Sequence, residues 1–140
     1  MKIGIIGLGI VGSAVDYGLR MLGHEIYPHD IKLKTTVNDV LDTEICYVCV
    51  PTPESDSGQC DVSIVKTVVK ELVDNKYEGI IAIKSTVVPG TTSELQQLYP
   101  SSRFCFVPEF LRERCAIADF VENHDLCIIG TNDESIFETI

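Results

Sequence analysis

Short apolar runs alternate along the chain with segments in which apolar residues recur at helical spacing. The runs are almost continuously apolar, which is the pattern of parallel strands that are buried on both faces. Strand-length runs followed by helical segments indicate repeated β-α-β units and a mostly parallel sheet covered by helices on both sides. The expected strands are Ile3–Ile6, Glu25–Pro28, Ile45–Val50, Ile80–Ile83, Phe104–Val107 and Leu126–Ile129.

Segments with apolar residues at helical spacing connect these runs, and no linker or shift in composition divides the chain. We therefore expect one α/β domain over residues 1–140, with about six strands. Asn132 or Asp133 resembles a helix cap, and the chain stops about two turns later, which suggests that the natural protein continues. The expected helices are Gly12–Leu22, Val62–Asn75 and Thr92–Leu98, with one short turn at Val37–Leu41.

The charge balance limits the partners of this chain. Against 21 Asp and Glu stand 11 Lys and Arg, so the net charge is -10. DNA, RNA and anionic membranes need a basic surface, and we expect none of them as partners. The apolar run after Met1 is too short for a signal peptide or a membrane span, and we expect a cytoplasmic protein.

Six cysteines raise the question of disulfides or metal. Four of them lie in the apolar runs, where cysteine behaves as a small apolar residue. Cys46 and Cys49 form a C-x-x-C string, but residues three apart on a strand point to opposite faces. Redox or zinc chemistry is therefore the less favoured alternative, and we expect no metal site.

The first apolar run ends in Gly7-Leu8-Gly9-Ile10-Val11-Gly12, a G-x-G-x-x-G string that opens a helix. Between a strand and a helix, such a string indicates a dinucleotide site in a Rossmann-type fold. Gly7 permits the tight turn, Gly9 lets the backbone approach a pyrophosphate, and Gly12 allows close packing of helix on strand. The alternative is a structural turn without a ligand, which this context disfavours.

Asp30 follows the second run and indicates which dinucleotide binds. A carboxylate at this place accepts hydrogen bonds from the adenosine ribose and repels a 2′-phosphate. We therefore expect NAD rather than NADP as the cofactor, although the nearby Lys32 and Lys34 weaken that preference.

Three further strand ends carry polar or proline-rich strings. They are Pro51-Thr52-Pro53, Lys84-Ser85-Thr86 and Pro108-Glu109-Phe110-Leu111-Arg112-Glu113. Ligands of open α/β sheets bind outside the carboxyl ends of the strands, so these strings should line one crevice. The alternative is that they only set backbone geometry or open a helix.

Together, the glycine string, Asp30 and these three strings resemble the N-terminal domain of the nucleotide-sugar 6-dehydrogenases, such as UDP-glucose 6-dehydrogenase. The resemblance extends over nearly the whole chain. It implies oxidation of a sugar C6 hydroxyl to a carboxylate with two NAD in succession, through an enzyme thioester. The complete hexapeptide looks more like the UDP-glucose and GDP-mannose branches, and we favour UDP-glucose as the nucleotide sugar.

The resemblance also assigns roles to residues. Glu109 would help water to attack the thioester, and Thr86 would hydrogen-bond to that water. Phe110, Leu111 and Arg112, with Glu109, would contact the nucleotide sugar. The remaining residues would contact NAD: Gly7, Leu8, Gly9, Ile10, Val11, Gly12, Asp30, Pro51, Thr52, Pro53, Ser85, Thr86 and Glu113.

The chain departs from this family in two ways. The segment Ile31 to Glu44 is shorter than usual, which reduces the expected cover over the adenosine. No cysteine here matches the family's nucleophile, and the central helix that pairs subunits is missing. The resemblance therefore implies an inactive isolated domain and a homodimer only for the full-length enzyme. A stand-alone NAD-binding module and a dehydrogenase of β-hydroxyacid type are the alternatives.

Overall fold

The computed structural model describes residues 1–123 and 126–140. Within them, a five-stranded parallel sheet carries helices on both faces, in strand order β2-β1-β3-β4-β5. This confirms the expected α/β fold of Rossmann type. The strands are β1 (Lys2–Ile6), β2 (Glu25–His29), β3 (Ile45–Val48), β4 (Ile80–Ile83) and β5 (Arg103–Phe106).

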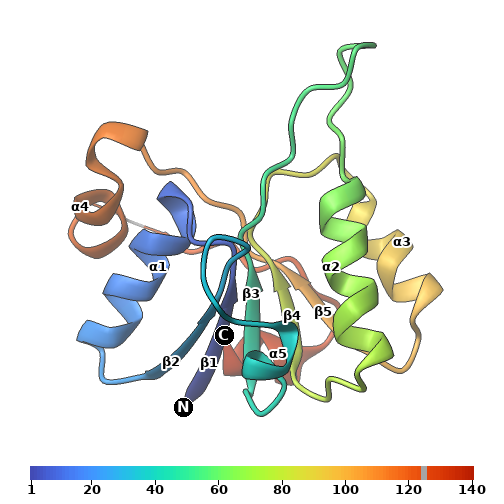
Figure 1. The fold of residues 1–140 in the computed structure, drawn as a ribbon, viewed down its shortest axis with the longest axis horizontal. Coiled ribbons are helices and arrows are strands. Elements are labelled where there is room, and N and C mark those ends of the chain that lie inside the picture. The colour runs from blue at the N-terminus through green and yellow to red at the C-terminus, as the bar shows by residue number, and fades with distance from the viewer. Residues whose placement is uncertain (124–125) are drawn as a thin grey trace.

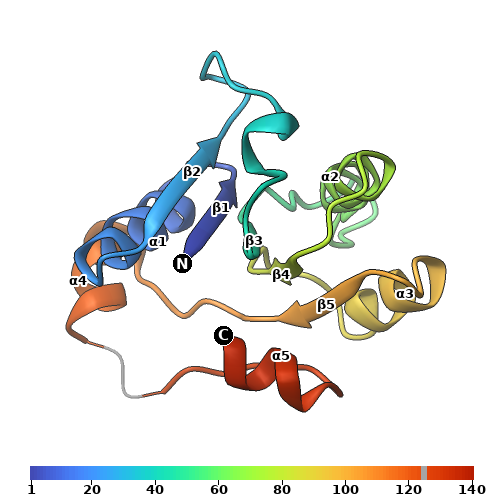
Figure 2. The same ribbon diagram turned by 90° about the horizontal axis from the view of Figure 1, so that it is seen from below.

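The helices form two layers, as Figure 2 shows. The helices α2 and α3 cover one face of the sheet, whereas α1, α4 and α5 lie on the other. None of the helices in the described part of the chain is long and apolar enough to cross a membrane. The helices are α1 (Ile10–Met21), α2 (Ser63–Asp74), α3 (Thr91–Leu98), α4 (Ala116–Val121) and α5 (Glu134–Thr139), with short 3₁₀ turns η1 (Val37–Val40) and η2 (Glu113–Cys115).

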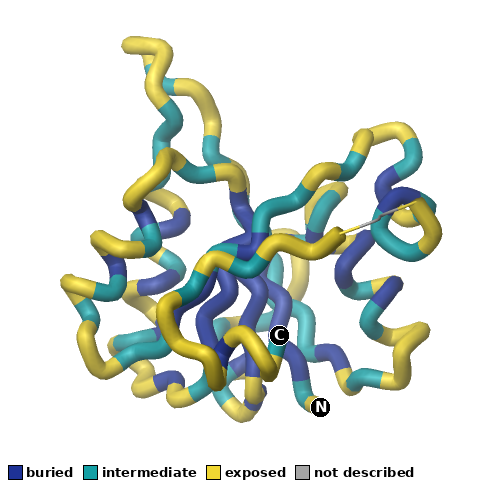
Figure 3. The backbone as a smooth tube through the Cα atoms, turned by 180° about the vertical axis from the view of Figure 1, so that it is seen from behind, coloured by how far each residue is buried: buried dark blue, intermediate teal, exposed yellow. Residues whose placement is uncertain are grey.

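The central strands are buried on both faces, which explains why their sequences are continuously apolar. Figure 3 shows this buried centre between half-buried and exposed helices. On β3, Cys46 packs into the cluster under α2, whereas Cys49, just past the strand, packs at the margin of the opposite cluster. The two thiols thus lie on opposite faces, as the strand geometry predicted.

The sixth expected strand, Leu126–Ile129, is not a strand in the structure. Directly after this segment, Gly130 forms an isolated antiparallel bridge with Phe106 of β5. Leu126 and Ile128 remain exposed, so the run is not the buried strand that its apolar sequence predicted. The helices α1, α2 and α3 match their predicted positions within two residues, and Asp133 caps α5 through the Ser135 N–H.

The strand order reverses between β1 and β3, because the chain moves from β1 outward to β2 and then returns to the other side of β1. The carboxyl ends of strands at such a switch point frame a crevice for ligands in open α/β sheets. The glycine string follows β1 and the segment Val50 to Pro53 follows β3. The fold therefore places the predicted cofactor residues at this point.

Candidate functional site

In the glycine turn, two positions have no room for a side chain, and the third faces open space. Gly7 has a φ of 94°, and a β-carbon there would lie 2.6 Å from the carbonyl oxygen of Cys49. A β-carbon on Gly12 would lie 1.9 Å from the carbonyl oxygen of Gly7. A β-carbon on Gly9 would meet nothing within 4 Å. The backbone at Gly9 is thus free to approach a phosphate at the start of α1.

Asp30 lies beside the glycine turn, directly after β2. One carboxylate oxygen accepts the Leu8 N–H at 2.7 Å, and the other accepts the Lys32 N–H at 2.8 Å. These two hydrogen bonds, that of Leu8 first, lower the pKa of the Asp30 carboxyl. The group is therefore ionised at neutral pH, and each oxygen keeps a lone pair with which it can accept a ribose hydroxyl.

The segment after β3 forms an arm that projects beyond the sheet edge (Figure 1). Thr52 is half-buried at its base, whereas Pro51 and Pro53 are exposed. The arm closes on itself through a bridge between Glu54 and Cys60. The Cys60 thiol lies 3.6 Å from the carbonyl oxygen of Thr86, so the arm stands against the loop that follows β4.

Ser85 is buried and ties the ends of β3 and β4 together. Its hydroxyl lies 2.7 Å from the carbonyl oxygen of Val50 and 3.2 Å from that of Val48. The hydroxyl proton is therefore used inside the protein, and Ser85 sits beneath the crevice. The next residue, Thr86, is exposed at the sheet edge.

Glu109 is held at the carboxyl end of β5 by groups on both of its oxygens. Oε1 accepts the N–H of Phe110 at 2.9 Å. Oε2 lies 2.7 Å from Nζ of Lys84, which follows β4, and the exposed fractions of the two side chains are 14% and 6%. The two side chains thus form an ion pair between the carboxyl ends of β4 and β5. Lys84 Nζ also lies 5.6 Å from the centroid of the Phe120 ring.

Arg112 forms an ion pair with a carboxylate on the neighbouring helix α4. Its Nε and Nη2 donate to the two oxygens of Asp119 at 2.9 and 2.7 Å, and its backbone N–H donates to the same carboxylate at 3.0 Å. This ion pair holds the pKa of Asp119 well below its usual range. The hexapeptide is thereby fixed to α4, and the Arg112 side chain acts within the protein. Phe110 is 65% exposed, and Leu111 is half-buried.

Sequence reasoning missed Asp119 and the helix α4 that carries it. The signal was a single acid in the apolar string Ala116-Ile117-Ala118-Asp119-Phe120, because a buried carboxylate needs a partner. The sequence interpretation also assigned no role to Lys84, although this residue is a buried cation that follows an apolar strand. In both cases the sequence shows that a buried charge needs a partner of opposite charge, but it does not show which residue that partner is.

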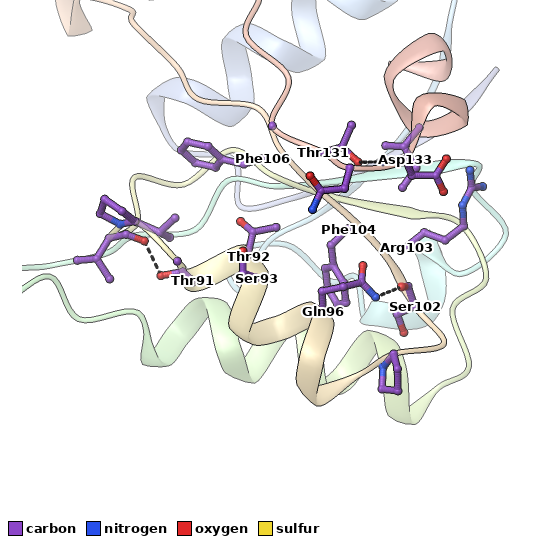
Figure 4. Close-up of a pocket in the computed structure, with 18 of the residues that line it drawn as sticks. Thr91, Thr92, Ser93, Gln96, Ser102, Arg103, Phe104, Phe106, Thr131 and Asp133 are labelled. Atoms are coloured by element: carbon purple, nitrogen blue, oxygen red, sulfur yellow. Dashed lines mark hydrogen bonds between the residues drawn. The ribbon is translucent and has the colours of Figure 1, made fainter.

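Two cavities lie near these elements. One, of about 550 Å³, is lined by Leu8, Gly9, Ile10 and Ser13 on one side and by residues 113–118 on the other. It brings Glu113 next to the glycine turn. A larger one, of about 860 Å³, runs along the outer edge of β5 between α3 and the segment 130–133 (Figure 4). It shares no residue with the glycine turn.

Three of the cysteines, Cys46, Cys49 and Cys105, have the properties of buried thiols. Burial raises the pKa of Cys49 and of Cys105 to about 12, and that of Cys46 further. All six are free, and no group of three or more His, Cys, Asp or Glu in the described residues could hold a metal ion.

The chain is similar to known proteins in both sequence and fold. Residues 29–140 match the model of the UDP-glucose/GDP-mannose dehydrogenase family, NAD binding domain. UDP-glucose 6-dehydrogenase AglM of Haloferax volcanii is 25% identical over 186 aligned positions, which cover 100% of this chain and 43% of the relative. This chain thus spans less than half of that relative's length.

Two solved structures superpose closely. GDP-mannose dehydrogenase of Pseudomonas aeruginosa, in a ternary complex, is 25% identical with a TM-score of 0.84, over 99% of this chain and 43% of that one. A UDP-glucose dehydrogenase from Pyrobaculum islandicum is 23% identical with a TM-score of 0.86, over 99% and 42%. The matched sequence and the glycine turn beside Asp30 agree on one assignment: the chain belongs to the UDP-glucose/GDP-mannose dehydrogenase family and is an NAD-binding domain of it.

Proposed function

We propose that this chain is the single NAD-binding domain of an enzyme that oxidises the C6 hydroxyl of a nucleotide sugar to the carboxylate, with UDP-glucose as the favoured sugar. Relatives named UDP-glucose 6-dehydrogenase and GDP-mannose 6-dehydrogenase support this reaction. The observation that carries the proposal is the Glu109 carboxylate, which lies largely buried at the carboxyl edge of the sheet beside Lys84.

In this proposal Glu109 is the base that takes a proton from water as it attacks the thioester. Its carboxylate suits that role by its position, because it is largely buried at the carboxyl edge of the sheet, where ligands of open α/β sheets bind. The Lys84 ammonium lies 2.7 Å from this carboxylate, and the ionised form of a carboxylate is the one that can take a proton. Thr86 follows Lys84 by two residues and would hold the attacking water from the loop after β4.

Phe110 and Leu111 would contact the nucleotide sugar from the hexapeptide. Arg112 would contribute backbone atoms rather than its guanidinium, since Asp119 holds that group. Because Arg112 is fixed in this way, the loop that carries Glu109 keeps one shape before the sugar binds. A loop that is already ordered loses less conformational entropy on binding.

NAD would accept the hydride that leaves C6. Gly9 and the start of α1 would face its pyrophosphate, and Asp30 would accept hydrogen bonds from the adenosine ribose. The ionised Asp30 also disfavours NADP, because a 2′-phosphate would lie against its negative charge.

No cysteine here matches the nucleophile of the family that the chain resembles, so in this proposal the thiolate of the thioester comes from a residue outside these 140. A thiol attacks as its thiolate, and the raised pKa values of Cys46, Cys49 and Cys105 keep these three protonated near neutral pH. We therefore expect the isolated chain to bind NAD without turning over a sugar.

A chimera tests the proposal. Residues 1–140 replace the matching part of the Haloferax volcanii relative, and the formation of NADH is followed with UDP-glucose and with GDP-mannose. We expect the chimera to form NADH with UDP-glucose. Glu109→Gln should lower the steady-state rate of NADH formation at least a hundredfold, and the thioester should accumulate. If NAD binds but neither sugar is oxidised, or if Glu109→Gln keeps the full rate, the proposed reaction is wrong.

A further inference from the structure

The cavity beside the glycine turn has two walls that come from distant parts of the sequence. One wall is the turn with the start of α1, where Gly9 is exposed and free of side-chain cover. The other is the turn η2 with the start of α4, residues 113–118. Only the first wall belongs to the glycine string that sequence analysis identifies as the dinucleotide site.

The second wall is fixed in place by contacts on either side of η2. At α1, a β-carbon on Gly18 would lie 2.5 Å from the Phe120 ring, so α4 packs directly on α1. Asp119 binds Arg112 before η2, and it also accepts the Cys115 thiol at 3.4 Å. The residues between these anchors therefore face the glycine turn in a defined position.

Two charged side chains line this cavity, and they are neighbours in sequence: Glu113 and Arg114. Arg114 is exposed, and it takes part in none of the ion pairs formed by the described residues. The first turn of α1 across the cavity has no acidic residue either. The start of α1 and the Arg114 guanidinium are thus the two positive groups of this cavity that can face a phosphate.

We propose that Arg114 binds the pyrophosphate of NAD from the η2 turn, opposite the start of α1. The inference rests on the NAD site proposed above and adds a residue that lies outside the glycine string. A guanidinium presents parallel N–H donors that match phosphate oxygens. The dinucleotide is then held between a helix N-terminus on one side and an arginine on the other.

The neighbouring Glu113 agrees with this arrangement. Oxidised NAD has a negative pyrophosphate and a positive nicotinamide ring, so a cation and an anion side by side match the charges of the two parts. Arg114 faces the pyrophosphate, and Glu113 faces the nicotinamide side. Charge complementarity of this kind fixes the direction in which a ligand lies.

Calorimetric titration of the 140-residue chain with NAD tests the proposal. Arg114→Gln should weaken NAD binding about fivefold, which is the usual effect of one exposed charge contact. Arg114→Lys, which keeps the charge, should recover part of the loss. The matched control is Arg103→Gln, which removes the same charge at the amino end of β5, the opposite edge of the sheet. Adenosine, which has no phosphate, should bind the unaltered chain and Arg114→Gln equally.

The salt dependence gives a second measurement. NAD affinity of the unaltered chain should fall more steeply with sodium chloride than that of Arg114→Gln, because one charge contact has been removed. Circular dichroism melting curves confirm that each variant is folded before titration. If folded Arg114→Gln binds NAD as the unaltered chain does, or if Arg103→Gln shows the same loss, Arg114 has no such role. If the unaltered chain binds no NAD, the cofactor site itself is wrong.

Discussion

Nζ of Lys84 and Oε2 of Glu109 lie 2.7 Å apart, although 25 residues separate them in sequence and both side chains are largely buried. Lys84 follows β4 and Glu109 follows β5, so the pair joins two neighbouring strand ends. A buried charge that loses its partner costs far more than an exposed one.

Loss of one partner should therefore destabilise the chain. We expect Lys84→Met or Glu109→Gln to lower the free energy of unfolding by about 3 kcal/mol, and the double variant to lose less than the sum. The matched control is Lys66→Met, which breaks an exposed pair with Glu94 at the same 2.7 Å and should cost no more than about 0.5 kcal/mol. Urea unfolding curves measure all four. Equal effects at the two pairs would mean that Lys84 and Glu109 are not held together in solution.

The fold could be predicted in those parts where burial alone decides the structure. The strands β3 and β4 coincide with continuous apolar runs, because strands buried on both faces leave no polar positions. The run Leu126–Ile129 is also apolar but is largely exposed, and an isolated bridge to β5 forms at the next residue, Gly130. Composition alone cannot separate these cases, since pairing depends on what lies next to the strand.

The sequence predicted where the site lies in the fold, but not the side-chain contacts within it. The glycine turn, Asp30, Thr86 and Glu109 could be placed at one edge of the sheet, because each follows a strand and the topology brings the carboxyl ends of the strands together. The contacts of Arg112 with Asp119 could not be predicted, since they depend on a six-residue helix that is held by packing against α1. Helices this short are marginal in isolation, and tertiary contacts determine where they form.

The glycine turn allows a sharp comparison of two equal substitutions. Gly12→Ala should lower the free energy of unfolding by about 3 kcal/mol, because its methyl group would overlap the carbonyl oxygen of Gly7. Gly9→Ala should leave stability within about 0.5 kcal/mol, because its methyl group meets open space. Thermal melting of both variants decides the matter. A stable Gly12→Ala would show that α1 does not pack on the turn as described.

Asp119 should make stability depend on pH in the acid range. Its pKa in the folded chain lies below the unfolded value of about 3.9, because Arg112 donates to the ionised carboxylate. The stabilisation is therefore complete above that value and is lost as the pH falls through the folded pKa. Asp119→Asn should remove this part of the acid dependence. Urea unfolding between pH 6 and pH 2 compares the two chains, and parallel curves would contradict the ion pair.

Asp30 should control both the affinity for NAD and the choice between NAD and NADP. Asp30→Ala removes the acceptor for the ribose and the hydrogen bond from Leu8, so NAD binding should weaken about tenfold. The ratio of NAD to NADP affinity should also fall, because the repulsion of a 2′-phosphate is gone. Asp133→Ala, which changes the cap of α5, is the matched control and should keep both values. Calorimetry with the two dinucleotides measures them, and unchanged NAD affinity would remove Asp30 from the site.

Glu113 should determine how well the domain distinguishes the two redox states of its cofactor. The nicotinamide ring is positive in NAD and neutral in NADH, so a nearby carboxylate stabilises the oxidised form. Glu113→Gln should therefore weaken NAD binding about threefold and leave NADH binding unchanged. The control Glu138→Gln removes the same charge from α5 and should leave both affinities as they are. Parallel titrations with NAD and NADH give the ratio. An equal loss for both forms would place the Glu113 carboxylate away from the nicotinamide ring, in contact with a part that the two forms share.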